Sequence, residues 1–368
     1  MSMTRKRYTE PQIVFALQQA EAGTPVGQLC RESWVHEVPL CARRRASPKE
    51  ETMAGIYFFD DFALDSRIQL ERTYVEPECI TPEPYQGEGG FVGGPSIQWC
   101  PELGCYRLWH SIISDSAAHQ HTVGLAESQD CASWEFTGHT YSGAGTMHGA
   151  MVYRDPHETD PDRLYKMAGS TARLGARPGR EDSSIVVTSS DGVNWDDAGL
   201  TRCWGKHRSD TSNCLFYNPV RECYQILHRA AFIDRRVAST WSTDLVNWSE
   251  PELIVHPDPL DPPCCQLYAM TAFYSDGVFI GFLLIHETDM LDPVPNKMGG
   301  RLITELVYSY DGFHWNRTHH RIIPYPRYPA FGAGSMAIVY GITGDFNPYH
   351  GLGVQKGYGS PGVVELHR

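Results

Sequence analysis

Two acidic residues, Asp210 and Glu88, are the first candidates for acid–base chemistry in this chain. Asp210 lies in the polar stretch KHRSDTSN, which leads into the apolar run CLFY, and Glu88 is flanked by glycines in YQGEGGFVGG. A carboxylic acid that donates a proton, with a second carboxylate that acts as a nucleophile or activates water, is a common pairing for acid–base catalysis. Simpler roles stay open, since Asp210 could cap a strand start and Glu88 could be a solvated loop residue.

These carboxylates need a scaffold that brings distant segments together, and a repeated motif indicates one. The pattern Ser-x-Asp-x-x-x-Trp occurs at 128–134, 189–195, 242–248 and 309–315, with starts 61, 53 and 67 residues apart. A fixed motif at a period of this kind is typical of a β-propeller. We expect each Asp to accept hydrogen bonds from backbone N–H groups at a hairpin tip, and each Trp to pack between sheets.

Each repeat reads as four strands. Two strands flank a Pro-containing turn (Pro101, Pro156 and Pro219 in the first three repeats), a third strand leads into the motif hairpin, and a fourth follows it. A fifth blade that mixes both chain ends would leave no open sheet edge, and four blades with a loose tail is the alternative. The sequence therefore predicts an all-β fold, a five-bladed β-propeller of four-stranded antiparallel blades, over residues 53–368.

The hairpins and the segments SIVVTSSDGVNW, STDLVNWSEPELI and LVYSYDGFHW carry a resemblance that covers residues 57–340. They resemble the five-bladed glycoside hydrolase superfamily that includes arabinanases, β-xylosidases and invertase-type fructosidases. The resemblance implies an active site at one mouth of the central channel, with an Asp/Glu pair and a third carboxylate. It implies a glycosidase, or a related glycosyl transfer enzyme, acting on a small carbohydrate. A non-catalytic carbohydrate-binding propeller is the alternative from another class.

The same resemblance suggests a third catalytic candidate, Asp155. Arg154-Asp155-Pro156 copies a triplet that invertase-like enzymes use to stabilise the transition state. Here the triplet follows the inner strand instead of preceding it, so a turn role for Asp155 is equally open. The Asn-Asp-Pro-Asn start of those enzymes is absent, which argues against fructosidase activity.

Further residues are predicted to bind substrate around the mouth. Aligning the repeats on their turn prolines places His148 at the strand start that Asp210 occupies in the next repeat. The aromatic candidates would stack on a sugar face. The predicted substrate-binding residues are His148, Asp61, Trp109, Trp204, Asn213 and Tyr268. No cofactor is expected, and the resemblance leaves open a structural divalent ion in the channel.

Three histidines recur at the end of the second strand of a repeat: His110, His228 and His286. A repeated position favours a repeated structural role, such as a bond to the neighbouring blade. If these strand ends border the mouth, the alternative is a ring of histidines that contacts sugar hydroxyls.

Residues 1–52 differ from the rest of the chain and are predicted to form a short helical extension. The segment TRKRYTEPQIVFALQQAEAGTPVGQLCRE resembles the N-terminal helix-turn-helix of insertion-element transposases, and the resemblance ends at Glu32. We interpret it as a remnant fused upstream of the propeller. Self-association through these helices is left open, and a transposon-linked DNA-binding protein is the remote alternative.

The composition of the chain limits the classes of partner that we expect for this protein. A net charge of −13 argues against nucleic acid as a partner of the propeller, and no apolar stretch is long enough to predict a membrane span. The 11 cysteines form no metal-binding spacing, and the N-terminus lacks a secretory signal. We therefore expect free thiols, a cytoplasmic protein and a carbohydrate partner.

Overall fold

The computed structural model describes residues 57, 59–62, 64, 72, 74, 78–79, 85, 93–115, 120–141, 147–170, 184–204, 209, 213–229, 234–287, 301–322, 337–338, 351–357 and 360–366. The chain divides into two compact units, residues 1–74 with 275–278 and residues 75–274 with 279–368. Residues 1–52 lie outside the described residues, so the helical extension and its boundary stay predictions. In the described part, no helix has the length and apolar character to cross a membrane.

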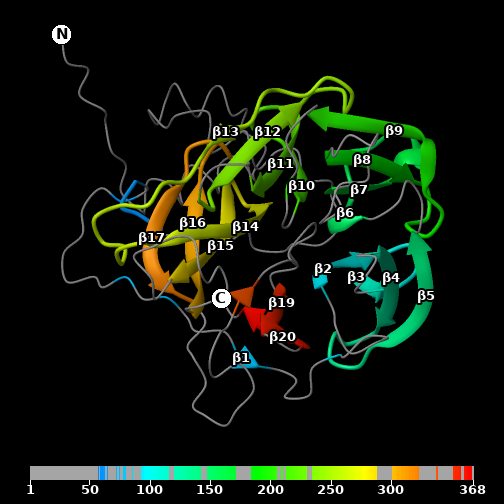
Figure 1. Ribbon diagram of the computed structural model, residues 1–368, viewed down its shortest axis with the longest axis horizontal. Helices are drawn as coiled ribbons and strands as arrows, with labels where there is room; N and C mark the ends of the chain where they lie inside the picture. Colours follow the sequence, from blue (N-terminus) through cyan, green and yellow to red (C-terminus); the bar gives the residue numbers. More distant parts are fainter. Residues whose placement is uncertain are drawn as a thin grey trace, which may run out of the picture. The chain divides into compact units, whose positions relative to one another are not determined.

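Four sheets follow one another along the chain, each with its strands in sequence order and antiparallel (Figure 1). The first is β2 (Gly93–Cys100), β3 (Cys105–Asp115), β4 (Gln120–Ser128) and β5 (Glu135–Tyr141). The second is β6 (His148–Arg154), β7 (Tyr165–Ser170), β8 (Ser184–Ser189) and β9 (Asp196–Trp204), with the 3₁₀ turn η1 (Pro161–Arg163) before β7. The third is β10 (Cys214–Asn218), β11 (Cys223–Arg229), β12 (Val237–Ser242) and β13 (Glu252–Leu253). The fourth is β14 (Gln266–Ser275), β15 (Val278–Glu287), β16 (Arg301–Ser309) and β17 (Asn316–Arg321).

A fifth sheet joins strands from both sides of this series. Its order is β1 (Glu78–Cys79), β20 (Ser360–Leu366), β19 (Gly351–Gly357) and β18 (Ala337–Ile338). Only the backbone of these four strands is described. None of them carries the Ser-x-Asp motif. Four complete motif-bearing blades are therefore what the structure shows, where the sequence predicts five. That the fifth sheet acts as a blade stays a prediction.

The inner strands of successive blades are linked by side chains. Ser96 Oγ on β2 accepts from the backbone N–H of Val152 on β6 at 3.0 Å, and Gln98 exchanges hydrogen bonds with the backbone of Val152 and Arg154. Side chains thus replace the backbone ladder between blades, which lets adjacent sheets splay while their buried polar groups stay paired.

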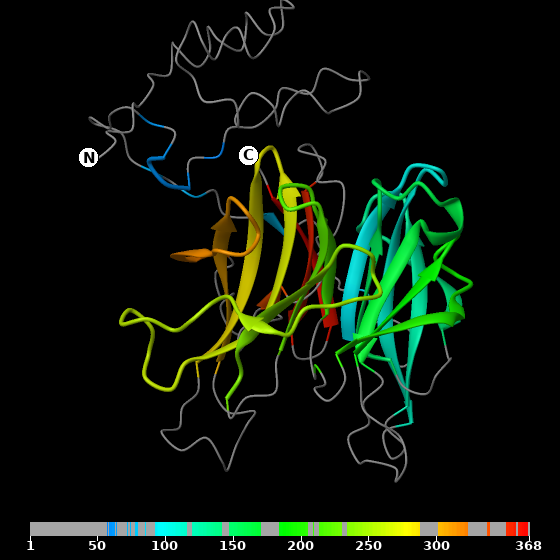
Figure 2. The same cartoon turned by 90° about the horizontal axis from the view of Figure 1, so that it is seen from above.

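The core follows from the strand sequences. β15, VFIGFLLIHE, is buried along its whole length, and its continuous apolar run suits a strand covered on both faces. Its Leu283 packs in one cluster with Leu215 of β10 and Leu267 of β14. Figure 2 shows the strands of each blade side by side as one sheet. The prediction of an all-β propeller with antiparallel blades is confirmed.

The repeated motif forms the hairpin tip that the sequence predicts. In the second blade, Ser189 Oγ accepts from the backbone N–H groups of Asp191 and Gly192, at 3.2 and 2.9 Å. Asp191 Oδ1 accepts from the N–H groups of Val193 and Asn194, at 2.8 and 2.7 Å. The other three hairpins repeat these bonds.

The residue after each motif Asp has a left-handed backbone, with φ of 57° at Cys131, 70° at Gly192, 63° at Leu245 and 78° at Gly312. Only glycine adopts this conformation without steric strain. The indole Nε1–H of the following Trp donates to the carbonyl of this residue in the first, third and fourth blades. That bond helps to hold the strained residue in place.

Each of two hairpins is also held by the blade that precedes it. Trp109 Nε1–H on β3 donates to Gly192 O at 2.8 Å, and Asn218 Nδ2–H on β10 donates to Asp311 O at 2.8 Å. The hairpins therefore serve as docking points between neighbouring blades.

Replacing Gly312 with Ala should lower the free energy of unfolding by about 2–4 kcal/mol, because left-handed strain adds to overpacking. A Cβ there would lie 2.6 Å from Asn218 Nδ2 and 2.7 Å from Gln225 Oε1. Gly104→Ala is the matched control, since Gly104 has φ of +64° but no atom within 4 Å of the added carbon. Urea unfolding of both variants separates the strain at a positive φ from the crowding between the third and fourth blades. Equal losses of unfolding free energy in the two variants would show that this contact is not tight.

The motif carboxylates should make the fold sensitive to acid. Burial opposes ionisation of Asp191, but backbone N–H bonds from Asn194 and Val193 lower its pKa from 3.8 to about 2. A lowered carboxyl pKa contributes stability that is present above pH 4 and is lost as the pH falls toward 2. Asp191→Asn should therefore cost about 1 kcal/mol at pH 7, the screened value for a mostly exposed group, and less at pH 2.5. Urea titrations of the wild-type protein and the variant at the two pH values measure the difference in their free energies of unfolding. A difference that is the same at both pH values would refute this prediction.

Candidate functional site

The antiparallel order gives every blade two distinct ends. At one end the motif hairpins and the turns after β2, β6 and β10 lie together, and we call this the hairpin end. At the other end the first strand of each blade begins and the second strand ends, and we call this the mouth end. The resemblance in the sequence implied a site at strand starts, so the mouth end is where the candidates have to be sought.

Two of the predicted residues, His148 and Asn213, lie at the mouth end, and the structure describes their backbone. His148 is the first residue of β6 and pairs with Ser170, the last residue of β7. Asn213 directly precedes β10, and both its backbone N–H and its side-chain Nδ2–H donate to Gly149 O, at 3.2 and 3.0 Å. The starts of β6 and β10 are therefore held side by side.

The two leading carboxylates, Asp210 and Glu88, lie outside the described residues. Asp210 precedes Asn213 by three residues in the sequence, and its place at the strand start stays a prediction. Trp204 is the last residue of β9, also at the mouth end, and its backbone pairs with Ser184. The roles of these three residues stay predictions.

Five polar and aromatic residues of the third and fourth blades gather at the mouth end. This mouth cluster consists of Arg229, Arg235, Gln266, Tyr268 and His286, from the end of β11, the entry to β12, the start of β14 and the end of β15. The guanidinium carbons of Arg229 and Arg235 lie 4.6 and 5.0 Å from the centroid of the Tyr268 ring. Tyr268, a predicted stacking residue, is partly exposed, and both guanidinium groups lie against its ring.

Hydrogen bonds orient the second guanidinium of the cluster. Arg235 Nη1 donates to Gln266 Oε1 at 2.7 Å and to His286 Nδ1 at 3.1 Å. Because a guanidinium can only donate, His286 Nδ1 is the acceptor of this bond. The cluster combines an aromatic face, hydrogen-bond donors and positive charge, which are the groups that bind hydroxylated or anionic ligands.

The structure corrects the assignment of Asp155. It lies at the hairpin end of β6, seven residues from His148, which is about 23 Å along an extended strand. Asp155 Oδ2 is 2.9 Å from Lys166 Nζ and accepts from Tyr224 O–H at 2.7 Å. Both charged side chains are fully buried. Asp155 therefore joins the second and third blades, and the turn role left open in the sequence is the one that its surroundings support.

Trp109 also differs from its predicted role, whereas the role of Asp61 is not tested. Trp109 is only 1% exposed and packs against Tyr165 in the core, so it offers no face to a sugar. Both faces of β3 are buried here, since Leu108 is 1% and His110 is 0% exposed, so a side chain on either face lies in a core. Asp61 is exposed and pairs with Arg72 at 2.5 Å within the smaller unit, and its role in substrate binding stays a prediction.

The recurring histidines separate into two kinds. Burial lowers the pKa of His110 to about 4 and the pKa of His228 to about 3, so both are neutral core residues at neutral pH. His286 is also buried, but it bonds to Arg235 from the preceding blade. The structural interpretation fits all three better than a ring that contacts sugar hydroxyls.

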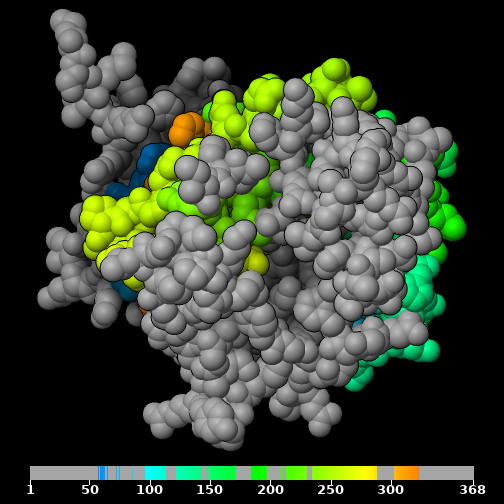
Figure 3. Space-filling view, in the orientation of Figure 1, coloured from blue at the N-terminus to red at the C-terminus, as the bar shows by residue number. Residues whose placement is uncertain are grey.

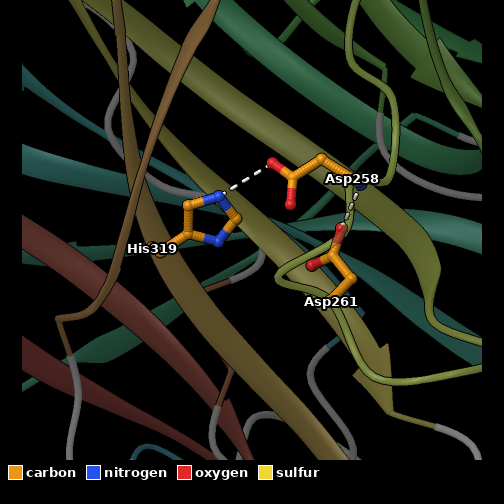
Figure 4. A group of neighbouring side chains, drawn as sticks. All are labelled: Asp258, Asp261 and His319. Atoms are coloured by element: carbon orange, nitrogen blue, oxygen red, sulfur yellow. Dashed lines mark hydrogen bonds and ion pairs between the residues drawn. The ribbon is translucent and has the colours of Figure 1, made fainter.

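One group of side chains has the composition of a metal site. Asp258, Asp261 and His319 offer ligand atoms within 4.8 Å of one another (Figure 4). Arg317 occupies the same place, however, since its Nη2 lies 2.7 Å from Asp261 Oδ1 and 2.6 Å from Glu305 Oε2. Burial opposes ionisation of Asp261, but the bonds from Arg317 prevail and lower its pKa. The arginine already forms ion pairs with Asp261 and Glu305, so we interpret the group as an ion-pair network.

That network fastens the stretch between β13 and β14 to the edge strand of the fourth blade. His319 of β17 bonds to Asp258 at 2.8 Å, and Leu260 in the same stretch is 75% exposed. The stretch, yellow-green in Figure 3, lies at the surface. Among the described residues, this stretch contributes no side chain to the mouth cluster.

Sequence reasoning missed three members of the mouth cluster: Arg229, Arg235 and Gln266. Arg229 follows His228 at the end of a second strand, and Arg235 directly precedes the third strand of that blade. Their common position at strand ends was a usable signal. Their convergence on Tyr268, in the next blade, was not, because it depends on how neighbouring blades pack.

Comparison with solved structures places the fold among known propellers. A glycosyl hydrolase from Bacteroides ovatus matches with a TM-score of 0.55 at 13% identity, covering 80% of this chain and 92% of that chain. An endo-arabinase from Bacteroides thetaiotaomicron matches with a TM-score of 0.50 at 11% identity, covering 81% and 98%. No family model and no curated protein matches the sequence. At these identities the likeness establishes the fold alone.

Proposed function

We propose that this chain is a glycoside hydrolase that binds a small carbohydrate at the mouth end of its blades. The observation that carries the proposal is the mouth cluster, which places an aromatic ring among oriented polar groups at the strand ends where the sequence places Asp210. Solved structures that share the fold include a glycosyl hydrolase and an endo-arabinase, which supports this reaction class.

In this proposal Asp210 and Glu88 are the two carboxylates of the reaction. One protonates the leaving oxygen of the glycosidic bond, and the other attacks the anomeric carbon or activates water. The two need different surroundings so that one stays protonated while the other is ionised. His148 and Asn213 would position the sugar from the bonded starts of β6 and β10, beside Tyr268 and Trp204. The sheet of β1 and β18–β20 would complete the channel as the fifth blade.

A panel of aryl glycosides that differ in sugar and anomeric configuration tests the proposal. We expect the full-length protein to release the aryl group from at least one member. Calorimetry of free sugars distinguishes the hydrolase from the main alternative, a protein that binds carbohydrate without cleaving it. Sugar binding without turnover of any glycoside would replace the hydrolase with a carbohydrate-binding propeller, and the absence of both would reject a carbohydrate function.

A further inference from the structure

Two cysteines close the hairpin between the first two strands of the first blade. Cys100 is the last residue of β2 and Cys105 is the first residue of β3, and the two are paired directly in the antiparallel register. Directly opposed residues point to the same face of a sheet, with Cα atoms about 4.5–5.5 Å apart, and a disulfide requires about 4.4–6.8 Å. The pair therefore has the backbone geometry of a disulfide, although both thiols are free in the structure.

The turn between the two cysteines fixes this pairing. The carbonyl of Cys100 accepts from the backbone N–H groups of Leu103 and Gly104, at 3.0 and 2.9 Å. Because the turn sets the register of a hairpin, the two cysteines stay opposite each other. The third blade has a turn of the same length, but there Asn218 is opposite Cys223. Among the four motif-bearing blades, the first alone places two thiols at this position.

The surroundings of the two thiols differ. Cys100 is 0% exposed, and the hydroxyl of Tyr165 from the second blade lies 3.3 Å from its Sγ. Cys105 is 5% exposed and lines an open groove of about 670 Å³, together with Leu103 and Arg107. A small oxidant would therefore reach Cys105 first. Burial raises the pKa of both thiols, that of Cys100 to about 11, so both are protonated at neutral pH and react slowly there.

We propose that Cys100 and Cys105 are a reversible redox modification site, at which a low-molecular-weight disulfide oxidises the pair to a disulfide across the hairpin. The Cys105 thiolate attacks one sulfur of the small disulfide, which forms a mixed disulfide and releases one small thiolate. The Cys100 thiolate then attacks Cys105 Sγ and releases the second. The two cysteines lose two electrons and two protons, and the small disulfide becomes two thiols. This site does not depend on the proposed glycosidase activity.

Mapping of the disulfide in the full-length protein tests the site. The reduced, folded protein is equilibrated with glutathione buffers from fully reduced to fully oxidised, quenched with acid, alkylated with N-ethylmaleimide in denaturant and cleaved after Glu102, which lies between the two cysteines. In the oxidised buffer we expect two joined peptides with no maleimide on Cys100 or Cys105, and dithiothreitol should restore full alkylation. Cys223 is the matched control, because it has the same position in the third blade opposite Asn218. It should form no link to another cysteine.

Two variants check the order of the steps. Cys100→Ser removes the second thiol and should leave Cys105 as a mixed disulfide with glutathione, whereas Cys105→Ser should leave Cys100 free for alkylation. The mapping of the wild-type protein requires neither variant to fold. Alkylation of both cysteines in the most oxidising buffer would overturn the site. A link from either one to a different cysteine, or glutathione retained on Cys105 of the wild-type protein, would overturn it as well.

Discussion

Replacing Lys166 with Met should lower the free energy of unfolding by about 3–5 kcal/mol, the cost of breaking a buried ion pair by removing one partner. Lys166 Nζ is fully buried and contacts Asp155 Oδ2 at 2.9 Å, Glu158 Oε2 at 3.0 Å and Arg163 O at 2.9 Å. Methionine fills a similar volume but leaves the Asp155 carboxylate buried without this cation. Unfolding in urea at pH 7, followed by tryptophan fluorescence, measures the loss.

Two further variants separate the charge effect from packing. Asp155→Asn combined with Lys166→Met removes both charges and should recover a large part of the lost stability. Arg154→Met is the matched control in the same blade, because its pair with Glu102 at 3.0 Å is nearer to solvent and contributes about 1 kcal/mol or less. A loss below about 1 kcal/mol for Lys166→Met alone would show that Asp155 does not depend on this lysine.

Replacing Asp210 with Asn should reduce the turnover of a responsive aryl glycoside by about 10²–10⁴-fold, the usual contribution of one acid–base group. Asparagine keeps the shape and one acceptor, but it can neither give up nor accept the proton at neutral pH. Sugar affinity should change little, because the loss concerns the transition state and not binding. Steady-state kinetics on the glycoside that the wild-type protein cleaves, with calorimetry of the free sugar, measure both quantities.

Glu88→Gln should have an effect of similar size, because the reaction needs two carboxylates. Asp196→Asn is the control, since Asp196 is an exposed carboxylate at the hairpin end of the same region of the chain. It should leave turnover unchanged. Full activity in both the Asp210 and the Glu88 variants would show that these residues are not catalytic. The result would not change the assignment of the fold.

The repeats were readable from the sequence because their determinants are local. Ser189 and Asp191 accept hydrogen bonds from backbone groups two or three residues away, so their spacing alone predicts the hairpin. The turn at Asp155 was visible for the same reason. Trp109 was misjudged because its aromatic character fits both a sugar platform and a core, and only its burial against the next blade decides between them.

The candidate site was less predictable because its members come together across blades. Tyr268 was named from its residue type, but its partners Arg229 and Arg235 belong to the preceding blade. Two residues from different sheets meet only if the angle between the sheets brings them together, and no spacing in the sequence encodes that angle. The helical extension at residues 1–52 and the roles of Asp210 and Glu88 stay predictions.

The hairpin tips have a consequence for how the chain folds. Each tip closes through hydrogen bonds between residues no more than three apart, so it can form within microseconds, before any two blades meet. The bonds that join one blade to the next connect residues 31–93 positions apart and require a much longer loop to close. The chain would therefore acquire its turns early and the order of its blades late, with partly assembled blades exposing unpaired edges in between.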